Sequence, residues 1–268
     1  MAVVSVVAGV PAPAASQLPI EPLKDSGQGV VAAYEGWFAN PDGSFSLLIG
    51  YYNRNLKQAL DIPIGPNNQI EPGSPDQGQP THFIPRRQWG VFAVRVPADF
   101  GDRKVTWTLT ANGKTTSVPM GLHRDYQVDP LRDTAQGNTP PILRFERDGA
   151  TAQGPPRGIA KTLAAARGQA LTLTAWTTDD AITTPERRPP DSPANLTWSK
   201  YRGPGTVTFA NVKPPVDKVS GMVSTTAQFS EPGQYVLRAH VTDASSEVWG
   251  GFQCCWTTAH VAVTVASD

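Results

Sequence analysis

The sequence predicts an all-β protein made of two antiparallel β-sandwich domains in tandem. Apolar and polar residues alternate in many short segments, which is the pattern of strands with one buried face. Proline and glycine, 26 and 24 of the 268 residues, separate these segments and mark turns. Helical periodicity is scarce: the best candidate is 159–167, where one or two helical turns are expected before Gly168. The length allows two domains of ordinary size.

A β-hairpin is predicted first, between residues 34 and 52. Residues 34–39 and 44–52 flank the sequence Asn-Pro-Asp-Gly at 40–43. Proline presets φ for a turn, and glycine supplies the positive φ that closes it. Alternate residues of the second strand should face the core, namely Phe45, Leu47, Ile49 and Tyr51.

The rest of the first domain follows the same alternation. Residues 91–96 place Phe92, Val94 and Val96 on one side, and residues 105–109 alternate with threonines. Asn112-Gly113 signals a second hairpin. In the stretch 63–85, prolines and glycines break any strand pattern. Since this loop exceeds the usual connection length, it is expected to be functional or held down by a partner.

A second domain is predicted beyond a linker at 123–141, which is rich in turn residues. Its strands are expected at 169–176, 195–200, 206–210, 223–229, 235–242 and 257–265. Strands at this spacing indicate an antiparallel sandwich. The predicted organisation is therefore an export signal or apolar tail (1–27), a first sandwich (28–122), the linker (123–141) and a second sandwich (142–268).

The second domain carries residues that resemble a known fold family. They are Gly168-x-x-Leu171-x-Leu173, Leu196-Thr197-Trp198, Gly203-Pro204-Gly205, Glu231-Pro232-Gly233-Gln234-Tyr235-x-Leu237 and Val261-x-Val263-x-Val265. This set is similar to an immunoglobulin-like or polycystic-kidney-disease-type sandwich. The resemblance implies that Trp198 fills the centre between the sheets and that Tyr235 forms a tyrosine corner. It implies nothing about activity.

Two short segments extend the resemblance over most of the chain. They are Glu-Gly-Trp-Phe at 35–38 and Gly-Phe-Gln-Cys-Cys-Trp-Thr at 251–257. In these segments the chain is similar to uncharacterised exported bacterial proteins with immunoglobulin-like domains. The resemblance brings no established activity with it.

Charge and hydropathy narrow the classes of partner and the compartment. Lys plus Arg and Asp plus Glu number 23 each, and this balance without basic clusters argues against nucleic acid. No stretch reaches the roughly 18 to 20 apolar residues that span a bilayer. Residues 2–10 are apolar and precede a cleavage-like Ala-Pro-Ala at 12–14, although the basic n-region is lacking. An export signal, and hence a periplasmic or extracellular location, is expected.

The two cysteines are adjacent, at 254 and 255. In one continuous strand Cys255 faces the core as a structural residue and Cys254 faces the other way, so their sulfurs cannot bond. A vicinal bridge is open only if the segment before Thr257 is a loop. On the outer face, Cys254, His240 and His260 form a candidate copper or zinc site. The alternative, which we favour, is that the histidines are solvated or interface side chains.

Aromatic and basic residues of the first domain form a second candidate site. Its members are Trp37, Tyr52, Arg54, Arg86, Arg87 and Trp89. Exposed tryptophan and tyrosine can stack on sugars or anchor a protein interface, where Trp, Tyr and Arg are enriched among hot spots. The alternative is that these aromatic side chains belong to the core.

No nucleophile elbow, phosphate-binding glycine loop, Rossmann fingerprint or zincin motif is present in the sequence. A non-catalytic structural or interaction protein without a cofactor is therefore predicted. We expect protein partners, among them an integral membrane complex that the chain would stabilise as an extracytoplasmic accessory subunit; the chain resembles accessory subunits of photosynthetic reaction-centre assemblies. The alternatives are a carbohydrate-binding module or adhesin, and a metal-handling protein using Cys254, Cys255 and His260.

Overall fold

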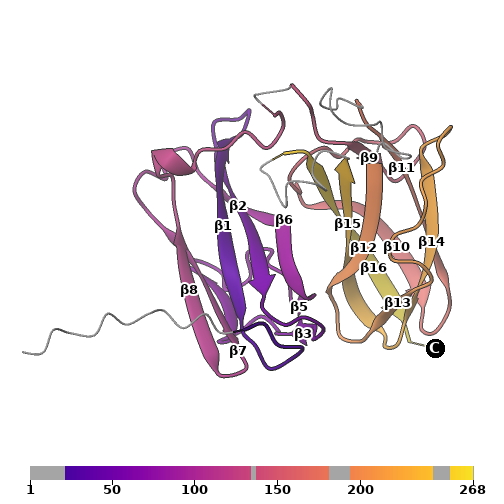
Figure 1. The fold of residues 1–268 in the computed structure, drawn as a ribbon, viewed down its shortest axis with the longest axis horizontal. Coiled ribbons are helices and arrows are strands. Elements are labelled where there is room, and N and C mark those ends of the chain that lie inside the picture. The colour runs from indigo at the N-terminus through magenta and orange to yellow at the C-terminus, as the bar shows by residue number, and fades with distance from the viewer. Residues whose placement is uncertain (1–21, 134–136, 181–193, 244–253, 268) are drawn as a thin grey trace, which may run out of the picture.

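The computed structural model describes residues 22–133, 137–180, 194–243 and 254–267. These residues form strands β1 to β16 and one short 3-10 helix, η1 (Arg124–Tyr126). The strands build two sandwiches that lie side by side (Figure 1). The predicted fold class is confirmed. The expected export signal lies largely in 1–21, outside the described residues.

The first domain contains two three-stranded sheets and a small two-stranded one. One sheet has the order β1 (Val30–Ala39), β2 (Phe45–Asn53), β6 (Arg86–Val96). The other has the order β4 (Asn68–Glu71), β7 (Val105–Ala111), β8 (Lys114–Met120). Strands β3 (Leu60–Asp61) and β5 (His82–Phe83) form the small sheet. The hairpins β1–β2 and β7–β8 are the two that the turn sequences predict.

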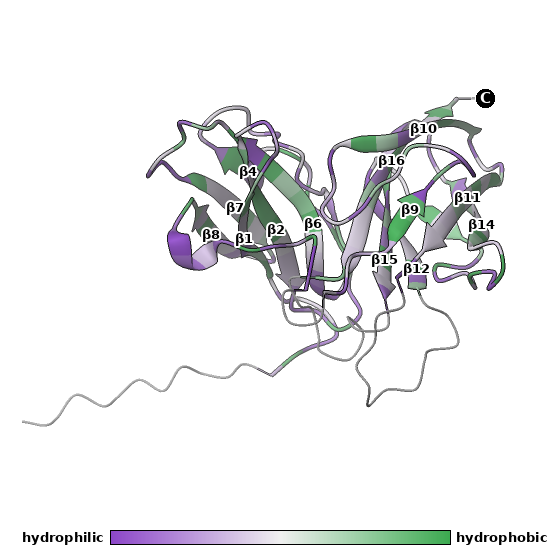
Figure 2. Cartoon of the chain, turned by 90° about the horizontal axis from the view of Figure 1, so that it is seen from above, coloured by the Kyte–Doolittle hydropathy of each residue, from purple (hydrophilic) through white to green (hydrophobic). Residues whose placement is uncertain are grey.

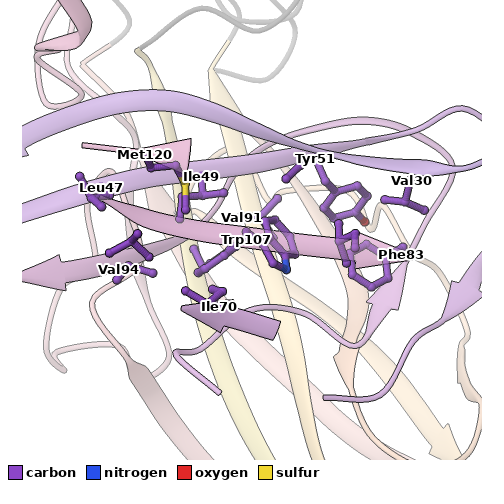
Figure 3. Packing of buried hydrophobic residues seen from close by; sticks show 14 of the residues in the cluster. Val30, Leu47, Ile49, Tyr51, Ile70, Phe83, Val91, Val94, Trp107 and Met120 are labelled. Carbon is purple, nitrogen blue, oxygen red and sulfur yellow. The ribbon is translucent and has the colours of Figure 1, made fainter. Parts of the chain in front are cut away.

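Trp107 occupies the middle of the first core (Figure 3). Its ring meets Phe92 edge-on at 5.1 Å between centroids, and its indole N–H donates to Asn68 at 2.9 Å. Phe92 comes from the opposite sheet, so the contact joins the two layers. The expected core residues Leu47, Ile49 and Tyr51 are buried in the same cluster.

The stretch 63–85 is more ordered than the sequence predicts, because it carries β4 and β5. The expectation that no strand forms there is wrong. Its second half is held down by the second domain: Arg202 binds Asp76 at 2.7 Å and the Gln79 carbonyl at 2.7 Å. Thr81 N–H also donates to the Tyr201 carbonyl at 3.2 Å. The loop is therefore fixed by a partner within its own chain.

The second domain has two four-stranded sheets. One has the order β13 (Val207–Phe209), β14 (Met222–Phe229), β11 (Leu171–Thr178), β9 (Ile142–Arg144). The other has the order β10 (Ile159–Ala166), β16 (Trp256–Ala266), β15 (Gly233–Asp243), β12 (Ala194–Arg202). Neighbouring strands are antiparallel except β10 and β16, which are parallel.

Strand β10 replaces the helical turns predicted at 159–167, so that prediction is wrong. Its alanines favour a helix locally. The ladder with β16 instead supplies the backbone hydrogen bonds, and Leu163 and Ala165 pack on the core from alternate positions. Tertiary packing thus overrides local propensity here.

Two residues of the resemblance take the roles it implies. Trp198 is buried between the sheets, with its ring 6.2 Å from that of Phe145. The Tyr235 hydroxyl donates to the Glu231 carbonyl at 2.8 Å and accepts from Gly205 N–H at 3.0 Å. This backbone tether is the geometry of a tyrosine corner.

Candidate functional site at the domain interface

The two domains meet where β6 of the first lies against β15 and β16 of the second (Figures 1 and 2). The apolar part of this interface is a buried cluster of Trp256 with Phe38 and Leu48. The Trp256 ring lies directly over Gly90, which has φ +52°. A Cβ at position 90 would lie 2.0 Å from the ring, so only glycine leaves room for it.

Arg238 is the polar centre of the interface. This β15 residue is only 4% exposed, although arginine is seldom fully buried without a partner. Its guanidinium donates to the Trp89 carbonyl at 2.5 Å and to the Gln88 side chain at 3.1 Å, both in the first domain. The cation therefore ties the second domain to the backbone of the first.

Glu35 supplies the carboxylate of the interface. Its two oxygens accept from Arg87 at 2.8 Å and from Gly90 N–H at 2.8 Å. Burial raises the pKa of Glu35 above its ordinary value, while the neighbouring Arg87 opposes that rise. Gly50 gives the carboxylate its space, since a Cβ there would lie 2.1 Å from the Glu35 oxygen. The carboxylate is thus held in one position by Arg87, Gly90 and Gly50, which all belong to the first domain.

Two histidines flank Arg238: His260 is buried and His240 is half-buried. His240 Nδ1 lies 3.0 Å from the guanidinium and 2.9 Å from the Thr258 hydroxyl. Because arginine can only donate, His240 Nδ1 accepts and the ring is neutral. His260 is 6% exposed, and its ring stacks 4.2 Å from that of Tyr201. Burial, and then the charge of Arg238, lower the pKa of His240 well below its ordinary value and that of His260 to about 3.

The cysteines form a vicinal disulfide, which corrects the expectation that their sulfurs cannot bond. Strand β16 begins at Trp256, so both cysteines precede it and the alternation of a strand does not apply to them. Both are buried, and their sulfurs lie 3.8 Å and 3.5 Å from the Asn138 carbonyl oxygen. A disulfide sulfur carries no proton, so these are contacts and not hydrogen bonds.

The predicted Cys254, His240 and His260 are not gathered as metal ligands. His260 pairs with Arg238 across the ladder and His240 with Thr258, so the histidines are diagonal neighbours. The sulfur of Cys254 is in the disulfide. Among the described residues, no three His, Cys, Asp or Glu side chains cluster as a metal site would require. The geometry matches the alternative of interface histidines.

The aromatic and basic residues of the second candidate site separate into two groups. Tyr52 pairs with Arg87 across the sheet, and the Arg87 guanidinium lies 3.7 Å over the Trp89 ring. Arg86, opposite Asn53, is exposed, and Arg54 follows the end of β2. Trp37 pairs with Leu47 instead, about 17 Å along β2 from Tyr52. Its indole N–H donates to the His123 carbonyl at 2.8 Å.

The interface joins the two segments on which the wider resemblance rests. Glu35 and Phe38 come from Glu-Gly-Trp-Phe, and Trp256 follows the cysteine pair. Sequence reasoning did not single out Gly90 or Arg238. The available signal was an arginine between two apolar residues of a strand. What its side chain contacts, however, depends on how the other domain docks.

Comparison with known proteins shows structural likenesses only. No protein-family model matches the sequence, and no curated protein matches it. Solved structures with similar folds include the D00-D0 domain of intimin, at 15% identity and a TM-score of 0.29, covering 88% of this chain and 99% of that one. Domains 4 and 5 of the S-layer protein SbsC are 11% identical at a TM-score of 0.25, covering 62% of this chain and 66% of that one. The titin tandem A164-A165 is 10% identical at a TM-score of 0.25, covering 90% and 98%.

Proposed function

We propose that this chain is a non-catalytic extracytoplasmic structural or interaction protein. In the proposal its two domains act as one rigid body that displays a binding surface to a protein partner. The interface described above fixes the domains to each other: Arg238 of the second domain is buried from solvent and binds the Trp89 carbonyl and the Gln88 side chain of the first.

One observation carries this proposal, the buried bond from Arg238 to the Trp89 carbonyl. Domains in one chain usually move relative to each other unless their interface is extensive and apolar. Here a desolvated cation spans the interface beside the buried Trp256 cluster. Separating the domains would rehydrate the charge, but it would also break these bonds and expose the tryptophan. A fixed spacing between two sandwiches suits a scaffold or spacer.

The binding surface in the proposal is the arginine-tyrosine-tryptophan group at the end of β2 and the start of β6, in which Arg86 is exposed and Tyr52, Arg54, Arg87 and Trp89 are half-buried. These are the residue types that dominate protein interfaces. The cross-strand pairs bring Tyr52 beside Arg87 and place Arg86 next to them. We propose that an integral membrane complex docks here from its extracytoplasmic side, and that the chain stabilises it as an accessory subunit, a photosynthetic reaction-centre assembly being the narrowest form of the proposal.

The test is affinity purification of the tagged full-length chain from detergent-solubilised membranes of its native host. A stoichiometric membrane protein is expected with the wild type and lost with Arg86→Asp. Arg86 is exposed and has φ 73°, a conformation that Asp tolerates, so the variant should fold. Lys218→Asp, an exposed reversal in the second domain, is the matched control. A wild-type chain recovered alone would refute the proposal.

A further inference from the structure

A groove of about 540 Å³ opens on the first domain, beside η1 and β8. These elements lie at the edge of the first domain farthest from the second (Figures 1 and 2). The groove is therefore accessible while the domains are docked, and its size is within the roughly 300 to 1,000 Å³ of small-ligand sites. Its lining includes aromatic and charged side chains, and the residues used below are Tyr34, Tyr126, His123, Asp102, Arg103 and Lys104.

Tyr126 belongs to the aromatic part of the lining. It is 52% exposed, and it is the only aromatic residue among the exposed large hydrophobic side chains of the described part of the chain. Its ring lies 5.4 Å from that of Tyr34 and 6.1 Å from that of His123. A tyrosine ring that is left half open on a groove offers a flat apolar face with a polar tip.

The Tyr126 ring is fixed before any ligand arrives. Trp37 accepts from Val128 N–H at 2.9 Å and donates from its indole to the His123 carbonyl, so β1 holds both ends of η1. Gly36, with φ +126°, allows this approach because a Cβ there would lie 2.5 Å from the Tyr126 carbonyl oxygen. Two residues of the Glu-Gly-Trp-Phe segment therefore build the platform. A preorganised platform loses little entropy on binding.

The charged part of the lining supplies one acceptor and one donor without partners among the described residues. Asp102 and Lys104 line the groove, and within the described residues neither side chain makes a hydrogen bond or ion pair. Arg103 between them is engaged, since its Nε donates to the Phe100 carbonyl at 2.8 Å and its guanidinium pairs with Asp99 at 3.1 Å. The free charges of the groove thus cancel, one carboxylate against one ammonium.

This combination discriminates between classes of ligand. A nucleic acid needs concentrated positive charge, which the balanced groove lacks. A peptide added as a strand to the neighbouring edge strand β8 would need its backbone donors, and Pro119 removes one at the groove. A sugar ring has an apolar face for Tyr126 and hydroxyls that both donate and accept, so it satisfies Asp102 and Lys104 together.

We propose that this groove binds a neutral pyranose saccharide. The sugar's C–H face packs on Tyr126, and its hydroxyls donate to Asp102 and accept from Lys104. This site is separate from the protein-docking surface proposed above, and it lies on other residues. A failed membrane pull-down leaves it standing, and a failed saccharide titration leaves the docking surface standing.

The test is isothermal titration of the full chain with cellotetraose, mannotetraose and chitotetraose, each up to about 10 mM. At least one should bind, and Tyr126→Ala should weaken it tenfold or more. Asp102→Asn should weaken it less, because the amide oxygen still accepts. Because the ligand is neutral, raising salt to about 0.5 M should change the affinity little.

Leu56→Ala is the control for loss of an exposed apolar side chain, since Leu56 is 39% exposed and lies outside the groove lining. Its affinity should equal the wild type's, and the unfolding temperature of each variant shows whether it is folded. The proposal is overturned if none of the three saccharides binds, or if binding survives Tyr126→Ala unchanged. Preferential binding of trigalacturonate, lost at high salt, would also overturn it in favour of an acidic ligand.

Discussion

Trp256 of the second domain lies over Gly90 of the first, at a place where any Cβ would come within 2.0 Å of the indole ring. Gly90 lies in β6 of the first sandwich and Trp256 begins β16 of the second, and the indole ring fills the space that a side chain at position 90 would need. The same glycine donates its N–H to Glu35. One position thus serves both the apolar and the polar part of the interface.

Gly90→Ala should destabilise the protein by roughly 2 to 4 kcal/mol, from overpacking against the ring and from the positive φ. Urea unfolding measures the loss. Gly43→Ala is the matched control, because Gly43 also has positive φ, +82°, but no atom lies within 4 Å of the point that its Cβ would occupy. It should cost only about 1 kcal/mol. In a Trp256→Ala background, Gly90→Ala should lower the free energy of unfolding no more than Gly43→Ala does. A larger loss for Gly90→Ala in that background would show that the Trp256 ring is not the cause.

Most strands of each domain could be predicted from the sequence, because the alternation of a buried face and the residues of its turns are local signals. The alternation of Leu47, Ile49 and Tyr51 and the Asn112-Gly113 turn, with φ of 49° and 73°, specify hairpins without help from distant residues. Strand β10 was not within reach, because its alanines favour a helix and only the pairing with β16 makes it a strand.

The domain interface could not be predicted from the local sequence pattern, for a different reason. The side chain of Arg238 points away from the core of the second domain. Such a side chain usually faces solvent, but here it faces the first domain. Likewise, strand alternation assigned the cysteines to opposite faces, but the strand begins only after them. A period of two cannot show where a strand starts or what covers its outer face.

Glu35→Gln should destabilise the protein by roughly 3 kcal/mol at neutral pH. The substitution removes the carboxylate that faces Arg87 and Arg238, leaving buried cations without a counter-charge. Urea unfolding is again the measurement. Asp25→Asn breaks an ion pair with Lys57 whose side chains are 58% and 78% exposed, and it should cost less than about 1 kcal/mol. Equal losses for the two variants would show that the interface pair contributes no more than a surface pair.

The disulfide between Cys254 and Cys255 predicts a defined thiol count. Protein unfolded in denaturant without reductant should take up no iodoacetamide, and after reduction it should take up two equivalents, which mass spectrometry resolves. Because both sulfurs are buried, the folded protein should also resist alkylation under mild reduction more than the unfolded one does. Labelling of both cysteines without reductant would show that the bridge is absent.

Lowering the pH should destabilise the interface between the domains. The pKa of His240 and that of His260 are lowered in the folded protein, chiefly by burial, so the unfolded state binds more protons below an ordinary histidine pKa of about 6.5. The stability each neutral ring contributes is present above that pH and is lost as the pH falls toward the folded pKa, about 3 for His260. Arg238 faces both rings, and Arg202 and the Tyr201 ring lie near His260. Arg238 itself faces Glu35, Tyr51 and Tyr201.

His260, with a folded pKa of about 3, should cost about 2 kcal/mol of stability at about pH 5 relative to about pH 7.5, and His240 should lower the stability in the same direction. Urea unfolding at the two pH values measures the total, which includes the carboxylates. His260→Gln should reduce the pH-dependent loss by about that amount, and His240→Gln should also reduce it, because glutamine does not titrate. His123→Gln, at a side chain that is 69% exposed, is the comparison variant outside the interface. A neutral ring beside Arg238 must resist protonation while the interface stays closed around it. If His240→Gln and His260→Gln both kept the wild-type pH dependence, these two rings would not be the acid-sensitive element.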